Sequence, residues 1–292
     1  MTTNTGATQV ASYGDHGERA WRGDQTMRHF TIHNDGVTIP VSRGGRGRPL
    51  VLCPELNSTQ ADLRELTELL RRDHDVVTFD LRGHGLTSAA DRYSFEAFLS
   101  DLTAVLAEPE RLGLPAAPVL VGYSLGADLA VHHASEHPGT VAGLVLIDGA
   151  NPVPEPFITE ADLPEFRAMW EDLATRQQAR RGTARQVLLT AQEILDLNVE
   201  IDAVRSGILD RYRKIDRPIS MIMSTSMAGD DGDARAARYN RNWRAGVERL
   251  VRDQPRISTS WLHADHGLIF THAPEIAQII RSAQRPAGPA TP

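Results

Sequence analysis

One serine of the chain stands where it could act as a nucleophile. Ser124 lies in the stretch "VLVGYSLGADLA", with Gly122 two residues before it and Gly126 two residues after it. An apolar run typical of a β-strand ends at this serine, and a helical pattern follows at once. The spacing G-x-S-x-G at such a junction is typical of a nucleophile elbow, in which glycines permit a tight turn that exposes the hydroxyl. Because the following helix points its free N–H groups at the same place, we expect the N–H of Leu125 to bind a developing oxyanion.

The elements that would hold this serine in place alternate along the chain. Strand-like segments recur between helical patterns, and an Asp-Gly turn after Asn34 separates two further strands at the start. Alternation of buried strands with helices predicts an α/β fold with a parallel sheet covered on both faces. The predicted strands after the first two are residues 49–53, 75–80, 118–124, 141–150, 218–226 and 257–264.

A long helical segment interrupts this alternation. Residues 151–216 contain no convincing strand and are too long for a connecting loop, so we expect an inserted lid over the carboxyl edge of the sheet, where α/β proteins bind ligands. Its apolar side chains predict an apolar pocket; those expected to face inward are Phe157, Met169, Trp170, Leu188, Leu189, Ile194 and Leu195. The predicted division is a flexible tail 1–26, a core 27–150 and 217–284, a lid 151–216 and a second tail 285–292.

Composition excludes several classes of function. A net charge of -7 over 292 residues argues against a protein that binds the phosphate backbone of nucleic acids. The chain shows neither a signal-peptide pattern nor an apolar run long enough to span a membrane, so a cytoplasmic protein is expected. The only cysteine, Cys53, is expected to be a buried apolar residue. No metal-binding spacing is visible, and no cofactor is implied.

Four segments together resemble the α/β-hydrolase superfamily. They are "FDLRGHGLTS" (79–88), "GYSLG" (122–126), "LVLIDGA" (144–150) and "DHGLIFTHAPEIAQII" (265–280), and they occur in the order that the superfamily has. The resemblance implies an eight-stranded, mostly parallel sheet with a helical cap. It also implies that His266 is the catalytic histidine, with Pro274 at the expected distance after it. The neighbouring His263 and His272, and His84 in the first segment, are expected to be structural.

The resemblance leaves the third member of a Ser-His-Asp triad open. The superfamily's usual acid follows the seventh strand, where this chain has "MSTSMAGDDGD" and its first acidic residues are Asp230 and Asp231. Some relatives instead place the acid at the end of the sixth strand, where this chain has Asp148. We favour Asp148 and keep Asp230 and Asp231 as alternatives, because a triad is defined by geometry and not by position in the sequence.

The sequence departs from the superfamily just after the third strand. The usual His-Gly is replaced by Pro54-Glu55, and the resemblance implies that the next residue, Leu56, supplies the second N–H of the oxyanion hole. One interpretation is that Glu55 pairs with an arginine and only shapes the loop. The other is that Glu55 modulates the site, either as a charge that opposes the oxyanion or as a protonated hydrogen-bond donor.

These residues predict acyl hydrolysis or transfer on an ester, thioester or lactone. Ser124 would attack the carbonyl, His266 would move the proton, and the partner would be a small-molecule acyl substrate of apolar character. Two alternatives stay open: other chemistry at the same serine, such as carbon–carbon hydrolysis, lyase or cyclase reactions, and ligand binding without turnover. Nothing in the sequence predicts the oligomeric state.

Overall fold

A single mixed sheet organises the computed structural model, which describes residues 27–230 and 234–284. Within these residues eight strands follow the order β1-β2-β4-β3-β5-β6-β7-β8. β1 pairs antiparallel with β2, and β2 antiparallel with β4, whereas all later neighbours are parallel. The predicted mostly parallel sheet is therefore confirmed. The strands are β1 (Arg28–Asn34), β2 (Val37–Gly45), β3 (Arg48–Cys53), β4 (His74–Phe79), β5 (Val119–Tyr123), β6 (Gly143–Ile147), β7 (Ile219–Ser224) and β8 (Ser258–Leu262).

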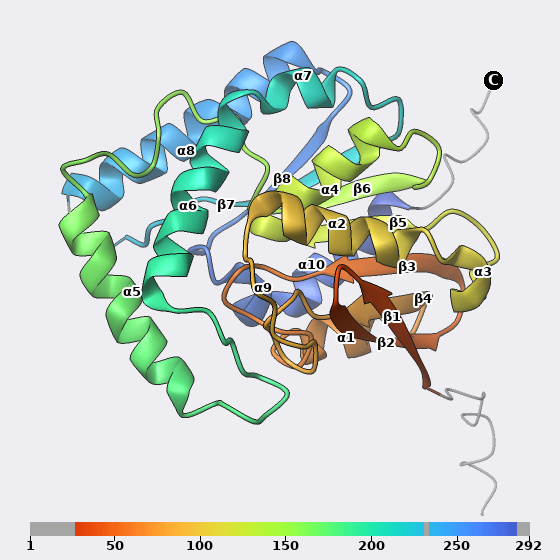
Figure 1. The fold of residues 1–292 in the computed structure, drawn as a ribbon. Coiled ribbons are helices and arrows are strands. Elements are labelled where there is room, and N and C mark those ends of the chain that lie inside the picture. The colour runs from red at the N-terminus through yellow and green to blue at the C-terminus, as the bar shows by residue number, and fades with distance from the viewer. Residues whose placement is uncertain (1–26, 231–233, 285–292) are drawn as a thin grey trace, which may run out of the picture.

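Helices cover both faces of this sheet (Figure 1). The described helices are α1 (Arg64–Leu70), α2 (Phe95–Leu106), α3 (Pro109–Leu112), α4 (Leu125–Glu136), α5 (Leu163–Gln178), α6 (Ala191–Ser206), α7 (Ile208–Tyr212), α8 (Ala234–Asp253), α9 (Leu268–Thr271) and α10 (Ala273–Ala283). None of these helices has the length and apolar character required to cross a bilayer.

Alternate residues of the central strands β3, β4, β5, β6 and β7 belong to two separate hydrophobic cores. Along β3, Val51 and Cys53 join the cluster that contains side chains of α2, α4 and α8. Leu50 and Leu52 point the other way, into the cluster made with α1, α9 and α10. This period of two is the mark of a strand buried on both faces, and it explains why the central strands are apolar without interruption. The sheet is thereby fixed from both sides, and its carboxyl edge is a rigid platform.

The segment 151–216 contains α5, α6 and α7 and no named strand (Figure 1). α5 packs against α6, and α6 is tied to the core by Arg205, whose guanidinium donates to both carboxylate oxygens of Asp128 on α4, at 3.0 and 2.7 Å. The loop before α6 also bonds to the core, because the N–H of Leu188 donates to the carbonyl of Gly83. That this segment works as a lid stays a prediction.

Inside this segment α6 begins at Ala191 and continues unbroken to Ser206. A capping box fixes its start, in which the Thr190 hydroxyl accepts from the N–H of Glu193 and the Glu193 carboxylate accepts from the N–H of Thr190. The predicted tails, 1–26 and 285–292, lie outside the described residues.

Candidate active site

Ser124 occupies a tight turn between β5 and α4. Its backbone adopts φ 50° and ψ -116°, a strained conformation for a residue with a side chain. A Cβ atom on Gly122 would lie 2.2 Å from the carbonyl oxygen of Gly126, and one on Gly126 would lie 2.4 Å from that of Cys53. Both glycines are therefore required by close backbone packing, as the spacing predicts, and the turn directs the serine side chain into a pocket.

The imidazole of His266 lies beside this hydroxyl. Its Nε2 is 3.0 Å from Ser124 Oγ, and the residue sits in the turn between β8 and α9. Tyr123 helps to hold this turn, because its hydroxyl donates to the carbonyl of His266 at 2.7 Å and its ring lies against the imidazole. The structure thus brings together two of the predicted site residues that are 142 positions apart in the sequence.

Asp148 contacts the other nitrogen of the same ring. It follows β6 directly, and its Oδ2 is 2.8 Å from His266 Nδ1. The carboxylate is fully buried and also accepts from the backbone N–H of Ser224 at 2.9 Å, from the Ser224 hydroxyl, and from Trp243 Nε1 at 3.0 Å. Its backbone has φ 44°, again unusual for a residue with a side chain. Every oxygen of Asp148 is therefore fixed, and with it the orientation of the imidazole.

The surroundings of His266 favour the charged imidazolium. Burial by itself lowers the pKa of a histidine, but the hydrogen bond and negative charge of Asp148 outweigh it, and the negative charge of Glu55 adds to them. The pKa of His266 is raised above its ordinary value as a result. A ring that accepts a proton from Ser124 and is then stabilised as a cation has the electrostatics of a general base.

The alternative acids do not reach this histidine in the described residues. Asp230 lies exposed on the loop after β7, and among the described residues the hydrogen bonds and ion pairs of the His266 ring nitrogens are made with Asp148, Ser124 and Glu55. Asp231 falls outside the described residues. The structure therefore joins Asp148, and not Asp230, to the imidazole.

The other histidines named from the sequence lie elsewhere. His263 is exposed and sits 3.3 Å from the Thr225 hydroxyl, and His272 precedes α10. His84 is buried, with its Nε2 2.6 Å from the carbonyl oxygen of Leu56, so it supports the loop that follows β3. Cys53 is buried as predicted, and burial raises the pKa of its thiol far above the range in which a thiolate forms.

Leu125 and Leu56, whose backbone N–H groups are the predicted oxyanion donors, both lie beside Ser124. Leu125 is the first residue of α4, and N–H groups in the first turn of a helix have no partner inside the helix. Leu56 is buried on the loop after β3, and both residues line the pocket together with Ser124. Their position suits the oxyanion hole that the sequence predicts.

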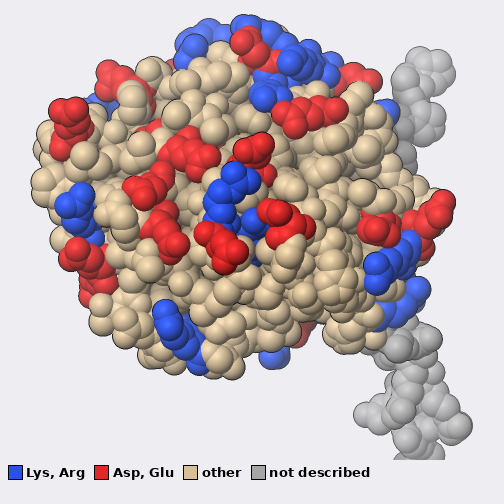
Figure 2. All heavy atoms as spheres, viewed as in Figure 1, with Lys and Arg blue, Asp and Glu red and all other residues tan. Residues whose placement is uncertain are grey.

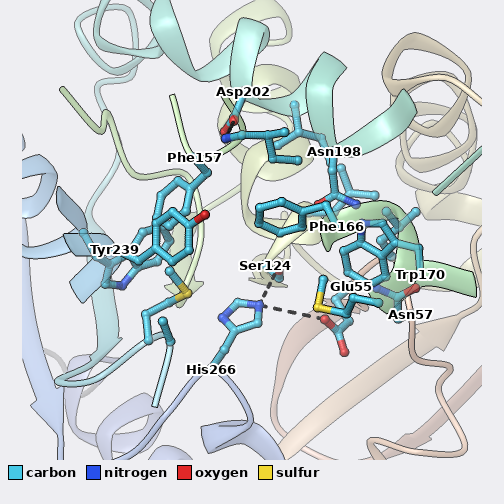
Figure 3. A pocket seen from close by; sticks show the side chains of 18 of the residues that line it. Glu55, Asn57, Ser124, Phe157, Phe166, Trp170, Asn198, Asp202, Tyr239 and His266 are labelled. Carbon is cyan, nitrogen blue, oxygen red and sulfur yellow. Dashed lines mark hydrogen bonds and ion pairs between the residues drawn. The ribbon is translucent and has the colours of Figure 1, made fainter. Parts of the chain in front are cut away.

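Glu55 lies on the pocket floor with its side chain 13% exposed. Its Oε2 is 3.9 Å from His266 Nε2, the nitrogen that also faces Ser124 (Figure 3). The predicted arginine partner is not found: among the described residues, His266 supplies the only ion-pair contact of Glu55 within 4 Å. Burial raises the pKa of Glu55, and the positive charge of His266 and the Ser58 hydroxyl partly oppose that rise.

The pocket over these residues has a volume of about 580 Å³. Figure 3 shows Phe157 and Tyr239 on one side and Trp170 with Asn57 on the other, with Ser124 and His266 between them. Phe157 stacks on the Tyr239 ring at 5.4 Å. Aromatic and aliphatic side chains together form most of the lining, as expected for a site that binds an apolar group, and polar side chains such as Asn198 and Asp202 form the rest.

The segment 151–216 supplies much of this wall. Of the seven side chains predicted to face inward, Phe157, Met169 and Trp170 line the pocket. Leu189, Ile194 and Leu195 are buried in packing instead, and Leu188 is half-buried on the loop before α6. Packing of this kind is expected for most of the seven, since a helix buries an apolar stripe whether or not it borders a ligand site.

Two residues that donate hydrogen bonds to Asp148 could not be predicted from the sequence. Ser224 ends β7 and Trp243 lies within α8, 76 and 95 positions from the Asp148 that they hold. Trp243 also lies against the Arg205 guanidinium, 5.9 Å from the ring centre, so that α6, α8 and the acid are linked. Only the tertiary fold brings these side chains to the acid.

Comparison with known proteins agrees with this architecture. A family model described as the alpha/beta hydrolase fold matches residues 48–285, and the chain belongs to this family. A solved thermophilic esterase from Thermogutta terrifontis superposes with a TM-score of 0.65 and 18% identity, covering 88% of this chain and 98% of that one. At that identity the likeness shows the fold alone.

Curated relatives match over shorter segments. One is a protein of Mycobacterium phage D29, provisionally named a non-heme haloperoxidase, with 34% identity over 128 residues, 42% of this chain and 44% of the relative. Another is N-formylmaleamate deformylase from Pseudomonas putida, with 33% identity over 107 residues, 36% of this chain and 38% of the relative. The match to each of these two relatives spans less than half of the relative's length.

Proposed function

We propose that this chain is a serine hydrolase or acyltransferase that acts on an ester, thioester or lactone through an acyl-enzyme. The observation that carries the proposal is the unbroken chain of hydrogen bonds from Asp148 through His266 to Ser124, at 2.8 and 3.0 Å. This chain ends at a pocket that Leu56 and Leu125 also line, and we assign their N–H groups to the oxyanion hole. Nucleophile, base, orienting acid and oxyanion donors are the parts that acyl transfer requires.

The geometry assigns a task to each residue. Ser124 Oγ attacks the carbonyl carbon while His266 Nε2 takes the hydroxyl proton, and the two N–H groups bind the oxygen as it becomes negative. Collapse of this intermediate expels the leaving group, which receives the proton from His266. Asp148 stays ionised and stabilises the imidazolium in both steps. A second nucleophile then removes the acyl group from Ser124 by the same proton transfers in reverse.

The pocket supports an apolar or aromatic acyl group. Its volume falls within the range of small-molecule sites, and most of its lining residues are apolar, aromatic ones among them. The arginines on its wall have carboxylate partners, since Arg205 pairs with Asp128 and Arg235 with Glu165. A substrate that depends on a free carboxylate or phosphate is therefore not favoured, whereas a neutral acyl group is.

Figure 2 shows one face of the molecule, on which acidic and basic side chains are interspersed. This mixture on the visible face, together with the net charge of -7, gives no support to a nucleic-acid partner. A small-molecule partner remains the proposal.

A panel of p-nitrophenyl esters with acyl groups from acetate to phenylacetate, extended by thioesters and lactones, tests this function. We expect the wild-type chain to cleave some of them and Ser124→Ala to cleave none, with an unchanged melting temperature. Ser135→Ala, on the same helix but away from the pocket, is the matched control and should retain full activity. Equal cleavage by wild type and Ser124→Ala would contradict the proposal. Failure of every acyl substrate would favour the alternatives of carbon–carbon chemistry or binding alone.

A further inference from the structure

The carboxylate of Glu55 faces the reacting nitrogen of His266, and the triad has no use for it. Among the described residues it meets no arginine or lysine within 4 Å, and its side chain is 13% exposed. Keeping a carboxyl in such a place opposes stability, because burial without an arginine or lysine partner disfavours its charged form. The superfamily usually has a glycine, with no side chain, at this position. Here the position carries a largely buried carboxyl that faces the site (Figure 3).

The distance between the two groups fits one bridging molecule. Glu55 Oε2 and His266 Nε2 are 3.9 Å apart, which is too far for a direct hydrogen bond. An oxygen atom placed about 2.8 Å from both would subtend an angle of about 90° between them. A water molecule, which has two hydrogens at a similar angle, can donate one to each group. The space between Glu55 and His266 is therefore a site for a water that donates two hydrogen bonds.

We propose that Glu55 orients the water molecule that hydrolyses the acyl-enzyme on Ser124. This inference rests on the proposed function. In the acyl-enzyme Ser124 Oγ has lost its proton, so His266 Nε2 can accept a hydrogen bond from the water. The water oxygen then bonds to the acyl carbon, one proton passes to His266 Nε2, and the other O–H remains donated to Glu55. When the acyl carbon–Oγ bond breaks, His266 returns its proton to Ser124 and the carboxylic acid leaves.

The proposal distinguishes hydrolysis from transfer. An alcohol has a single O–H, and the donation of this hydrogen to His266 leaves none for Glu55. Water alone uses both acceptors, so Glu55 assists deacylation by water and not by an alcohol. A hydrogen bond to a charged group corresponds to about 10- to 100-fold in rate. The chain is then a hydrolase, and its acyltransferase activity should emerge when Glu55 is removed.

The test measures acylation and deacylation separately, in wild type, Glu55→Ala and Glu55→Gln. With p-nitrophenyl acetate in a rapid-mixing instrument, the burst of p-nitrophenol reports acylation and the later steady rate reports deacylation. We expect Glu55→Ala to acylate within about threefold of wild type and to deacylate 10- to 100-fold more slowly. Mass spectrometry should show the acetyl group accumulating on Ser124. Glu55→Gln, which keeps an acceptor oxygen, should recover a large part of the deacylation rate.

Added methanol provides the second readout. In Glu55→Ala the ratio of methyl acetate to acetate should rise at least tenfold over wild type, because only the reaction with water is impaired. Deacylation and product ratio equal to wild type would overturn the role of Glu55. An equal fall of acylation and deacylation in both variants would also overturn it, since a structural role acts on both steps. If wild type cleaves no acyl substrate of the panel, the proposed function itself fails, and the inference fails with it.

Discussion

Two buried carboxylates approach one imidazole from opposite nitrogens, and their surroundings differ. Asp148 meets His266 Nδ1 at 2.8 Å and accepts further hydrogen bonds from Ser224 and Trp243. Glu55 stands 3.9 Å from His266 Nε2, and its pKa is raised by burial. The first carboxylate is held by donors from two other elements, whereas the second faces the cavity.

This difference shows how surroundings assign roles to identical functional groups. A carboxylate whose oxygens are fully hydrogen-bonded is suited to hold a histidine in one tautomer and orientation. A carboxyl that faces a cavity, with few donors of its own, can bind what enters that cavity. On our proposal, the pair separates an orienting acid from a water-binding acid around the same base.

Loss of the orienting acid should have the largest effect on turnover. In Asp148→Asn we expect kcat to fall by about 10⁴, because the amide cannot both hold the required tautomer and stabilise the imidazolium. The measurement is steady-state ester hydrolysis, with circular dichroism as a check of the fold. Asp230→Asn is the matched control and should change kcat less than twofold, since that side chain is exposed. A dead Asp230→Asn beside an active Asp148→Asn would reverse the assignment.

A smaller effect is expected from one donor to Asp148. Ser224→Ala removes the hydroxyl that donates to the carboxylate but keeps the backbone N–H, which also donates. Since one hydrogen bond to a charged group is lost, kcat should fall about tenfold. KM should stay constant, because Ser224 does not line the pocket. An unchanged kcat would show that the remaining donors suffice to hold the acid.

Replacement of Glu55 should change the pH dependence of the protein's thermal stability. The pKa of Glu55 is raised above its ordinary value of 4.5, so between that value and the raised one the folded state binds a proton that the unfolded state has released. Stability consequently falls as pH rises through this window. Glu55→Gln removes the titrating group and should raise the melting temperature at pH 8, with little change near pH 4. A variant that is less stable than wild type at pH 8 would show that the ionised carboxylate is stabilised by contacts.

The sequence predicts Ser124 and His266 better than the residues that hold Asp148 in position. Ser124 and its two glycines form a local pattern, because the close contacts that exclude side chains arise within one turn of the chain. His266 occupies the turn that the superfamily resemblance implies. Asp148 competes with Asp230 and Asp231 in the sequence, since choosing between them requires the path of the loop after β7. Their catalytic roles stay predictions that the experiments above can test.

The supports of Asp148 depend on tertiary packing. Trp243 is one of several apolar residues on an amphipathic helix, and no feature of α8 indicates that its indole N–H reaches an aspartate 95 positions away. Glu55 is visible in the sequence as a departure from the superfamily, but only coordinates show that no arginine of the described residues forms an ion pair with it. The boundary of α6 was readable in advance, because Thr190 and Glu193 have the spacing of a capping box.

The most direct test of the central claim is covalent labelling with a fluorophosphonate, followed by intact-mass and peptide mass spectrometry. The account predicts one adduct per chain, located on Ser124 and absent from Ser124→Ala. Labelling should slow strongly in Asp148→Asn and remain at the wild-type rate in Asp230→Asn. An adduct on any other residue, or a folded chain that takes no label, would contradict a serine nucleophile at this site.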